Sequence, residues 1–259
     1  MTVDELRQRF ERLAPRERLL VSVGVVFVVA ALLYALLLQP LSSAHDAAER
    51  RVIVNLGGFC NITALEPGRD PDAVRGADVC ACNHLLNAAA RLALDAPYDR
   101  DGANALRGVP HADAVRVLRG RLDAQRAARR SLGTGDELLA DLPALASSRS
   151  PHDLLASVVD ALAATIADAV APCAPARVLL AGGSVRNAAL VKALRERLAP
   201  IPVEPTDALG VPASHREAAC FAVLGALCAD RTPITLPAIT GAPAPAPISG
   251  AWVDPRRQP

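Results

Sequence analysis

The longest uninterrupted apolar run of the chain lies near its start, from Leu19 to Leu38. Its twenty residues, LLVSVGVVFVVAALLYALLL, carry no charge, and as a helix they would be about 30 Å long, which is the thickness of a bilayer core. A buried helix of a soluble protein would show a polar face, and a cleaved signal peptide usually has a shorter apolar region. The pattern favours a transmembrane helix over 19–39, with a signal peptide cleaved near Ser42 or Ala44 and a buried helix as the alternatives.

From Arg51 onward the apolar runs become short and are separated by turns. RVIVNL, NITAL and the segment from Val74 to Cys80 predict three strands joined by tight turns, which is typical of an antiparallel meander. Helices and strands then alternate. We expect helices over 83–94, 112–128, 151–171, 187–198 and 214–229, and strands over 177–181 and 201–204. This order predicts a mixed α/β layer, with the hairpin of residues 51–65 at the centre of the sheet and the last three helices packed on its faces.

Composition limits the classes of function and the compartment. The chain has 259 residues and balances 28 basic against 27 acidic residues, which excludes the basic footprint of a nucleic-acid-binding protein. Six cysteines form no CxxC pair and have no histidine at metal-ligand spacing. We therefore expect free, mostly buried thiols in a reducing compartment, with metal or redox use as the alternative.

Two Gly-Gly turns follow predicted buried strands, in NLGGFCN (residues 55–61) and in AGGSVRN (residues 181–187). Glycine lets backbone N–H groups approach a phosphate closely, because no Cβ intervenes. In the second motif the turn leads into a helix, whose N-terminus favours an anion, although Asn187 could simply cap that helix. Taken alone, each motif is also what a tight turn without a ligand looks like.

A carboxylate and an amide follow near the third strand, Asp78 and Asn83 in GADVCACN. A carboxylate at a strand end can hold a magnesium-bound water or a sugar hydroxyl. The simpler interpretation is that Asp78 accepts a hydrogen bond from nearby backbone.

Seven segments in order carry a resemblance to a known family: VNLGGFCNIT, GADVCACNHLLN, PYDRDGA, RRSLGTGDEL, LLAGGSVRNAAL, REAACFAVLG and LPAITGA. Over about residues 51–242 they resemble the C-terminal half of anhydro-N-acetylmuramic acid kinase. That family uses ATP to convert 1,6-anhydro-N-acetylmuramic acid to N-acetylmuramic acid 6-phosphate in cell-wall recycling. The resemblance implies an α/β fold, a single domain of the hexokinase/actin-type ATPase fold with a mixed sheet and flanking helices.

The resemblance also implies roles for individual residues. Gly57 and Gly58 match the turn that holds the β- and γ-phosphates, and Ser184 stands where the family's adenosine loop usually has a third glycine. The implied ATP-binding residues are Gly57, Gly58, Asn61, Gly182, Gly183 and Asn187. The residues implied to lie near the sugar substrate and Mg²⁺ are Asp78 and Asn83, in a motif that reads DVCACN instead of DTGPGN. Glu217 matches a Glu-Ala pair of the family's late helix.

The family's first domain brings a phosphate loop and an Asp general base, and neither has a counterpart before Arg51. We therefore expect no catalytic residue in this chain, nucleotide and amino-sugar as ligands, and no turnover by the chain alone. Kinases of this family tend to be dimeric, which implies a homodimer.

About residues 5–50, with LAPRERLL before the apolar run and LLLQPL at its end, resemble the type II secretion system protein M family. That resemblance implies a cytoplasmic tail (1–18), a span (19–39) and a junction (40–50), followed by the kinase-like domain (51–242) and a Pro/Ala-rich tail (243–259). Five arginines precede the span, which places the N-terminus in the cytoplasm and residues 40–259 across the inner membrane. A kinase domain belongs in the cytoplasm, so a secretion-type membrane protein and a fusion artefact of the two parts remain alternatives.

Overall fold

The computed structural model describes Ala14, residues 50–65 and residues 73–249. The chain separates into two compact units, Met1–Ala48 and Glu49–Pro259, and every helix and strand described below belongs to the second. The expected helix over 19–39, together with its signal-peptide and buried-helix alternatives, lies outside the described residues.

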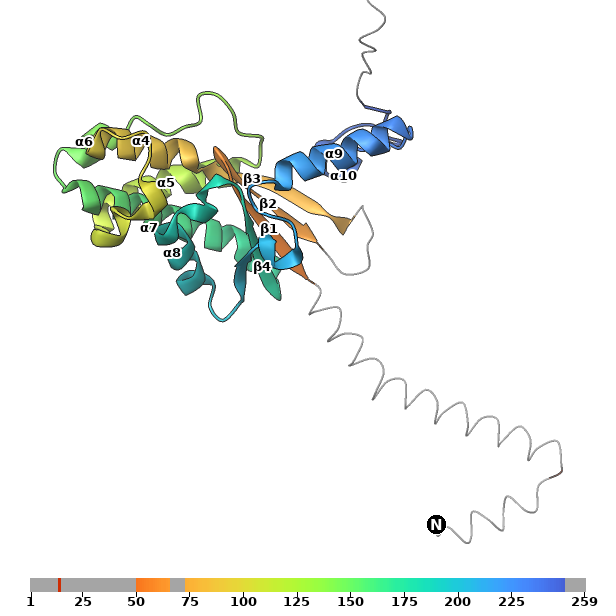
Figure 1. Ribbon diagram of the computed structural model, residues 1–259, viewed down its shortest axis with the longest axis horizontal. Helices are drawn as coiled ribbons and strands as arrows, with labels where there is room; N and C mark the ends of the chain where they lie inside the picture. The colour runs from red at the N-terminus through yellow and green to blue at the C-terminus, as the bar shows by residue number, and fades with distance from the viewer. Residues whose placement is uncertain (1–13, 15–49, 66–72, 250–259) are drawn as a thin grey trace, which may run out of the picture. The chain divides into compact units, whose positions relative to one another are not determined.

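A five-stranded mixed sheet forms the middle of the second unit, with the strand order β3-β2-β1-β4-β5 (Figure 1). β1 (Arg51–Leu56), β2 (Phe59–Leu65) and β3 (Arg75–Ala81) pair antiparallel, as the meander pattern predicts. β4 (Arg177–Ala181) lies parallel to β1, and β5 (Val203–Pro205) lies parallel to β4. β1 is therefore the central strand, and the predicted mixed α/β layer is confirmed.

A layer of helices covers one face of this sheet. It consists of α4 (Asn83–Leu94), α5 (Ala112–Ala128), α6 (Leu142–Ala146), α7 (Pro151–Val170) and α8 (Ala188–Leu198). Short 3-10 helices connect them at Arg100–Gly102, Ala105–Arg107, Ala171–Cys173, Gly183–Arg186 and Thr206–Leu209. Alternate residues of β1 face this layer, so Val52, Val54 and Leu56 are buried while the residues between them are half-exposed.

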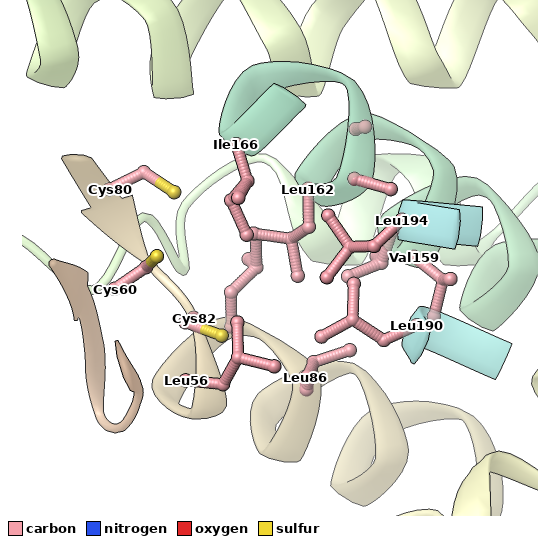
Figure 2. Packing of buried hydrophobic residues seen from close by; sticks show 14 of the residues in the cluster. Leu56, Cys60, Cys80, Cys82, Leu86, Val159, Leu162, Ile166, Leu190 and Leu194 are labelled. Carbon is pink, nitrogen blue, oxygen red and sulfur yellow. The ribbon is translucent and has the colours of Figure 1, made fainter. Parts of the chain in front are cut away.

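Helix α7 is the central element of the core. Figure 2 shows Val159, Leu162 and Ile166 of this helix beside Leu190 and Leu194 of α8. Within the described residues, the segment Pro151–Cys173 is long and apolar enough to cross a membrane. Because 78% of its most apolar stretch is buried by other elements of the domain, we assign it as a core helix.

Helices α7 and α8 each begin with a residue whose side chain caps the helix N-terminus. Ser150 Oγ accepts a hydrogen bond from the Asp153 N–H and Pro151 follows it, so α7 begins where the sequence offers both start signals. Asn187 Oδ1 accepts from the Leu190 N–H at 3.0 Å and caps α8. The capping interpretation of Asn187 is confirmed.

Helices α9 (Arg216–Ala229) and α10 (Pro237–Thr240) lie on the side of the sheet away from α4, α5 and α7 (Figure 1). Ile239 of α10 packs near Gly76 of β3. In α9, Cys228 alone is buried. The expectation that residues 214–229 pack on a face of the sheet is therefore wrong: the helix forms, and most of its apolar side chains remain exposed.

The cysteines behave as small hydrophobic side chains. Cys60, Cys80 and Cys82 are free and fully buried beside the apolar core (Figure 2). Burial raises the pKa of the Cys82 thiol to about 12 and that of Cys60 and Cys80 well above the usual range. Among the described residues no group of three or more His, Cys, Asp or Glu could hold a metal ion. Cys173 is half-buried, and Cys220 departs furthest from the expected burial, since it is exposed on α9.

Candidate functional site

The two Gly-Gly turns meet at one edge of the sheet. Because β1 and β4 are parallel neighbours, their carboxyl ends lie side by side. A Cβ atom at Gly182 would lie 2.7 Å from the carbonyl carbon and oxygen of Leu56, the residue before the first turn, and Gly182 has φ +89°. Only glycine fits this close approach. The structure thus brings together Gly57-Gly58 and Gly182-Gly183, as a shared nucleotide cleft requires.

A side-chain bridge ties this junction to the start of α4. Asn83 Nδ2 donates to the Leu56 carbonyl at 3.2 Å, and Ser184 Oγ donates to Asn83 Oδ1. Ser184 is 6% exposed, so its hydroxyl is committed to this bond. Asn83 therefore links the end of β1 to the loop after β4, and both its amide nitrogen and its amide oxygen are hydrogen-bonded.

A first cavity of about 400 Å³ lies between this loop and the start of α9. Its polar lining includes Asn55, Arg186, Asp207, Arg216 and Glu217. The Nε atom of Arg216 is buried and has no hydrogen-bond partner among the described residues. Because Arg186 and Arg216 both line the cavity, their guanidinium groups offer cationic donors to an anionic ligand.

A second cavity of about 290 Å³ lies on the other side of the same loop. Gly183 and Arg186 line both cavities. Here the first turn of α4 contributes Asn83, Leu86 and Asn87, and a loop after α4 contributes Tyr98, Asp99, Arg100 and Asp101. The lining combines apolar side chains with amides and charges of both signs, which is the usual make-up of a small-molecule site.

The loop that closes this second cavity is held by its own residues. Asp99 accepts hydrogen bonds from the Asn104 backbone and side chain and from the Ala105 N–H, at 2.8–3.0 Å. Gly102 has φ +68° and packs so closely on the Asn187 amide that a Cβ would collide with it. The PYDRDGA segment is therefore a fixed wall of the cavity, built against the cap of α8.

A row of polar side chains crosses the face of the sheet that the helical layer leaves uncovered. Asn55 pairs with Asn61 across β1 and β2, and Asn61 pairs with Asp78 across β2 and β3. Directly opposed residues on neighbouring strands share a face, and all three side chains are half-exposed. Asn61 and Asp78, two of the candidate residues, thus lie together on this face, while Asn83 lies at the sheet edge beside Ser184.

One oxygen of the Asp78 carboxylate is already used: Oδ2 accepts the Leu132 N–H at 2.8 Å. The backbone interpretation of Asp78 is therefore confirmed for that atom. The RRSLGTGDEL segment that supplies this N–H is itself pinned, since Arg130 makes two hydrogen bonds to Asp136 and the Gly133 N–H makes a third. The hydrogen bond from Arg130 is the main cause, and the bond from the Gly133 N–H the next, that lowers the pKa of the Asp136 carboxyl to about 2. Asp78 is thus held by the backbone of this loop, and its Oδ1 makes no hydrogen bond within the part of the chain that the structure describes.

Several lining residues were not singled out by motif reasoning. His84 packs on the first Gly-Gly turn, with its ring 4.9 Å from that of Phe59 and its Nε2 nearest to the position of a Cβ at Gly58. Asp207 lines the first cavity. His84 stands inside the quoted segment GADVCACNHLLN, and Asp207 follows the last strand. Their positions after strand ends could have identified them, because ligand sites of α/β sheets gather there.

Comparison with known proteins agrees with this geometry. The family description "Anhydro-N-acetylmuramic acid kinase" matches residues 33–253, beyond both limits of the expected 51–242. "Type II secretion system (T2SS), protein M transmembrane region" matches residues 5–54. Both resemblances are therefore confirmed.

Curated relatives named anhydro-N-acetylmuramic acid kinase include that of Salinibacter ruber, 37% identical over 79% of this chain and 54% of the relative. The relative from Bordetella pertussis is 39% identical over 80% of this chain and 56% of its own length. The chain thus spans little more than half the length of these relatives.

Two solved structures share weaker similarity. The activator of 2-hydroxyisocaproyl-CoA dehydratase from Clostridium difficile with bound ADPNP has a TM-score of 0.41 and 16% identity, covering 63% of this chain and 58% of its own. The ROK hexokinase from Thermus thermophilus has a TM-score of 0.27 and 20% identity, covering 61% and 52%. With its family description matched from residue 33 to 253, the chain belongs to the anhydro-N-acetylmuramic acid kinase family.

Proposed function

We propose that the described domain is the ATP-binding half of an anhydro-sugar kinase of the hexokinase/actin-type fold. One observation carries the proposal: the loop Gly182-Gly183 touches the end of β1 at the Gly57-Gly58 turn, beside a cavity that Arg186 and Arg216 line. ATP would lie along the second loop, with its phosphates toward the first turn. Asn187 would then act indirectly, by capping the helix behind the loop.

The residues around the loop suit a nucleotide. Arg186 and Arg216 can pair with phosphate oxygens through charge-assisted hydrogen bonds, and Asp207 can accept from a ribose hydroxyl. The described residues hold no ready-made metal cluster, and the Asn83 amide is occupied at both ends. Mg²⁺ would therefore arrive with the nucleotide, held mainly by its phosphates, and Asp78 is the one carboxylate among the residues that the resemblance implies.

The relatives' name supplies the reaction that we propose for the complete enzyme: ATP-dependent conversion of 1,6-anhydro-N-acetylmuramic acid to N-acetylmuramic acid 6-phosphate. The amino-sugar would approach the uncovered face of the sheet, where Asn61 and Asp78 lie. We assign no catalytic base in this chain. A homodimer and a peptidoglycan-recycling role in the cytoplasm complete the proposal for the kinase part.

The match of residues 5–54 to a secretion-system membrane region favours a second candidate function for the N-terminal part. We propose that residues 19–38 anchor the chain in the inner membrane as a single span. Five arginines before this segment favour a cytoplasmic N-terminus, which would carry the kinase-like domain across the membrane and away from ATP. The two proposals thus compete for the location of residues 51–242.

A nucleotide-binding titration of the full chain tests the ATP proposal. Arg216→Gln removes a charged donor while leaving the α9 backbone intact, and we expect about 10-fold to 100-fold weaker binding of a fluorescent ATP analogue. Gly182→Ala places a Cβ against the Leu56 carbonyl at positive φ, and should abolish binding and lower the melting temperature.

Gly120→Ala on the exposed side of α5 is the matched control, because a Cβ there meets nothing within 4 Å. It should bind the analogue like the wild-type chain. Unchanged affinity in Arg216→Gln, measured on a variant that melts like the wild-type chain, would overturn the ATP assignment.

A further inference from the structure

The turn between β1 and β2 is contacted by a histidine to which the nucleotide proposal gives no role. His84 is the second residue of α4, and its side chain is exposed. A Cβ atom at Gly58 would lie 2.5 Å from His84 Nε2 and 3.0 Å from its Cδ2. The imidazole therefore rests directly on the Gly58 backbone, and a larger residue at position 58 would displace it.

Two contacts position this ring beside the turn. The ring centroids of His84 and Phe59 lie 4.9 Å apart and the rings are tilted by 57°, which is a favourable arrangement of two aromatic rings. The His84 backbone N–H donates to the Gly58 carbonyl at 3.3 Å. An imidazole carries an N–H donor in either tautomer, yet neither ring nitrogen is hydrogen-bonded to another residue that the structure describes. The His84 donor is therefore available to a ligand.

The backbone amides at the start of α4 are used by the turn itself. The Cys82 N–H donates to the Gly58 carbonyl at 2.9 Å. The Asn83 N–H donates to the Gly57 carbonyl at 3.0 Å. Amides in such positions are the donors that a helix N-terminus normally offers to an anion. Because these two hold the turn against α4, an anion at the turn needs donors from side chains or from the turn's own amides.

The contacts of the glycines place His84 at the far end of a row of polar side chains. Asn55 lies between the two Gly-Gly turns, since its Oδ1 is 2.9 Å from the position of a Cβ at Gly182 and its Nδ2 is 3.4 Å from that of a Cβ at Gly57. His84 contacts the next glycine, Gly58. A phosphate chain that runs from the second loop toward the first turn would thus pass Asn55 and reach His84 with its last phosphate.

We propose that the His84 imidazole donates a hydrogen bond to the terminal phosphate of a nucleoside triphosphate, and that this bond makes the site select triphosphates over monophosphates. The inference rests on the proposed function for the presence of the nucleotide. A hydrogen bond from an imidazole N–H to a phosphate oxygen is charge-assisted and therefore stronger than a neutral one. His84 acts in binding alone, and no covalent bond forms or breaks at its ring.

Calorimetric titrations of the full chain with AMP and with ATP test this role. His84→Phe keeps an aromatic ring against Phe59 and removes the donor, so we expect about 10-fold weaker binding of ATP and unchanged binding of AMP. His84→Gln restores an N–H donor through its amide and should recover most of the affinity for ATP. His152→Phe at the start of α7, where the side chain lines neither cavity, is the matched control and should bind both nucleotides like the wild-type chain.

The results separate this inference from the proposed function. Equal ATP affinity of the wild-type chain and His84→Phe would overturn the inference alone. An equal loss of affinity for AMP and ATP, with a lower melting temperature of the variant, would show that His84 only supports the turn, and would overturn the inference as well. A wild-type chain that binds neither nucleotide would overturn the proposed function, and the role of His84 with it.

Discussion

At the scale of single residues, the candidate site contains a serine, Ser184, where the family resemblance implies a third glycine of the adenosine loop. The Ser184 hydroxyl donates to Asn83, whose amide nitrogen in turn donates to the carbonyl of Leu56. A loop that glycine would leave free is thereby tied to the end of β1. We infer that the serine makes the backbone of the loop less flexible and that its hydrogen bond fixes the loop beside β1.

Replacing Ser184 separates these two contributions. Ser184→Ala removes the hydroxyl and leaves a buried amide oxygen with one donor fewer, so we expect a loss of about 1 kcal/mol of unfolding free energy. Ser184→Gly adds backbone freedom to the unfolded chain and to the loop, and should lower both stability and affinity for the ATP analogue further. Urea unfolding and the nucleotide titration measure the two effects. Equal values for wild type and both variants would show that the bridge is not formed in solution.

The sequence predicts the two Gly-Gly turns well and the remaining candidate residues less well. Strand ends followed by glycine pairs are local features, and parallel neighbours bring such ends together. Asn61 and Asp78 could be placed on one face only through the strand register, since the bulge between Cys60 and Asn61 shifts the pairing of β2 with β3. The hydrogen bond from Leu132 to Asp78 spans 54 residues, and no local pattern indicates it.

At the scale of elements, apolar periodicity identifies the helices closely. The helices α4 and α5 have the bounds that their patterns predict, and α7 ends one residue earlier. The short helix α6 and the 3-10 turns were missed, because five residues or fewer show no period. Helix α9 was predicted as an element and misplaced in the packing. Its apolar character implies burial, but the sequence does not say by what.

The first turn of α7 offers a test of electrostatics at this scale. Asp153 Oδ1 accepts the Val109 N–H at 2.8 Å, and chiefly this bond, followed by that with Ser150, lowers the pKa of the Asp153 carboxyl. A lowered folded-state pKa means that the charged form stabilises the fold above the pKa of the unfolded chain. That contribution is lost as the pH falls through the folded-state value.

Asp153→Asn should therefore unfold at a lower temperature than the wild-type chain at pH 7, because the loop Gly108–His111 loses its charged acceptor. The gap between the two melting temperatures should shrink as the pH drops from about 5 toward 3. Calorimetry across this range measures it. Asp95→Asn, at the end of α4, serves as the comparison, because the Asp95 carboxylate accepts no hydrogen bond from the described residues. A gap that stays constant with pH would contradict an electrostatic origin.

At the scale of the whole molecule, the described domain would supply one side of the proposed kinase site. The helical layer leaves the face of the sheet that carries Asn55, Asn61 and Asp78 to the short helix α10, whose Ile239 packs near Gly76, and α9 beside the cavity proposed for ATP is exposed. Both features concern surfaces that an intact relative, nearly twice as long as the match, has further chain to cover. The domain thus has a hydrophobic core of its own. Its surface is exposed to solvent where the substrate and the phosphoryl group would meet.

This openness predicts that the full chain alone does not phosphorylate anhydro-N-acetylmuramic acid. The family resemblance puts a phosphate loop and a general base outside this chain; loss of a general base costs about 10²–10⁴-fold in rate, and loss of half the electrostatic cradle of the γ-phosphate adds to it. The measurement is sugar-dependent ADP release, with the Bordetella pertussis relative as the positive control. Turnover within tenfold of that relative would contradict the prediction. Asp78→Asn and Asp101→Asn would then identify the base, and Asp78 is the stronger candidate because its Oδ1 makes no hydrogen bond within the described part of the chain.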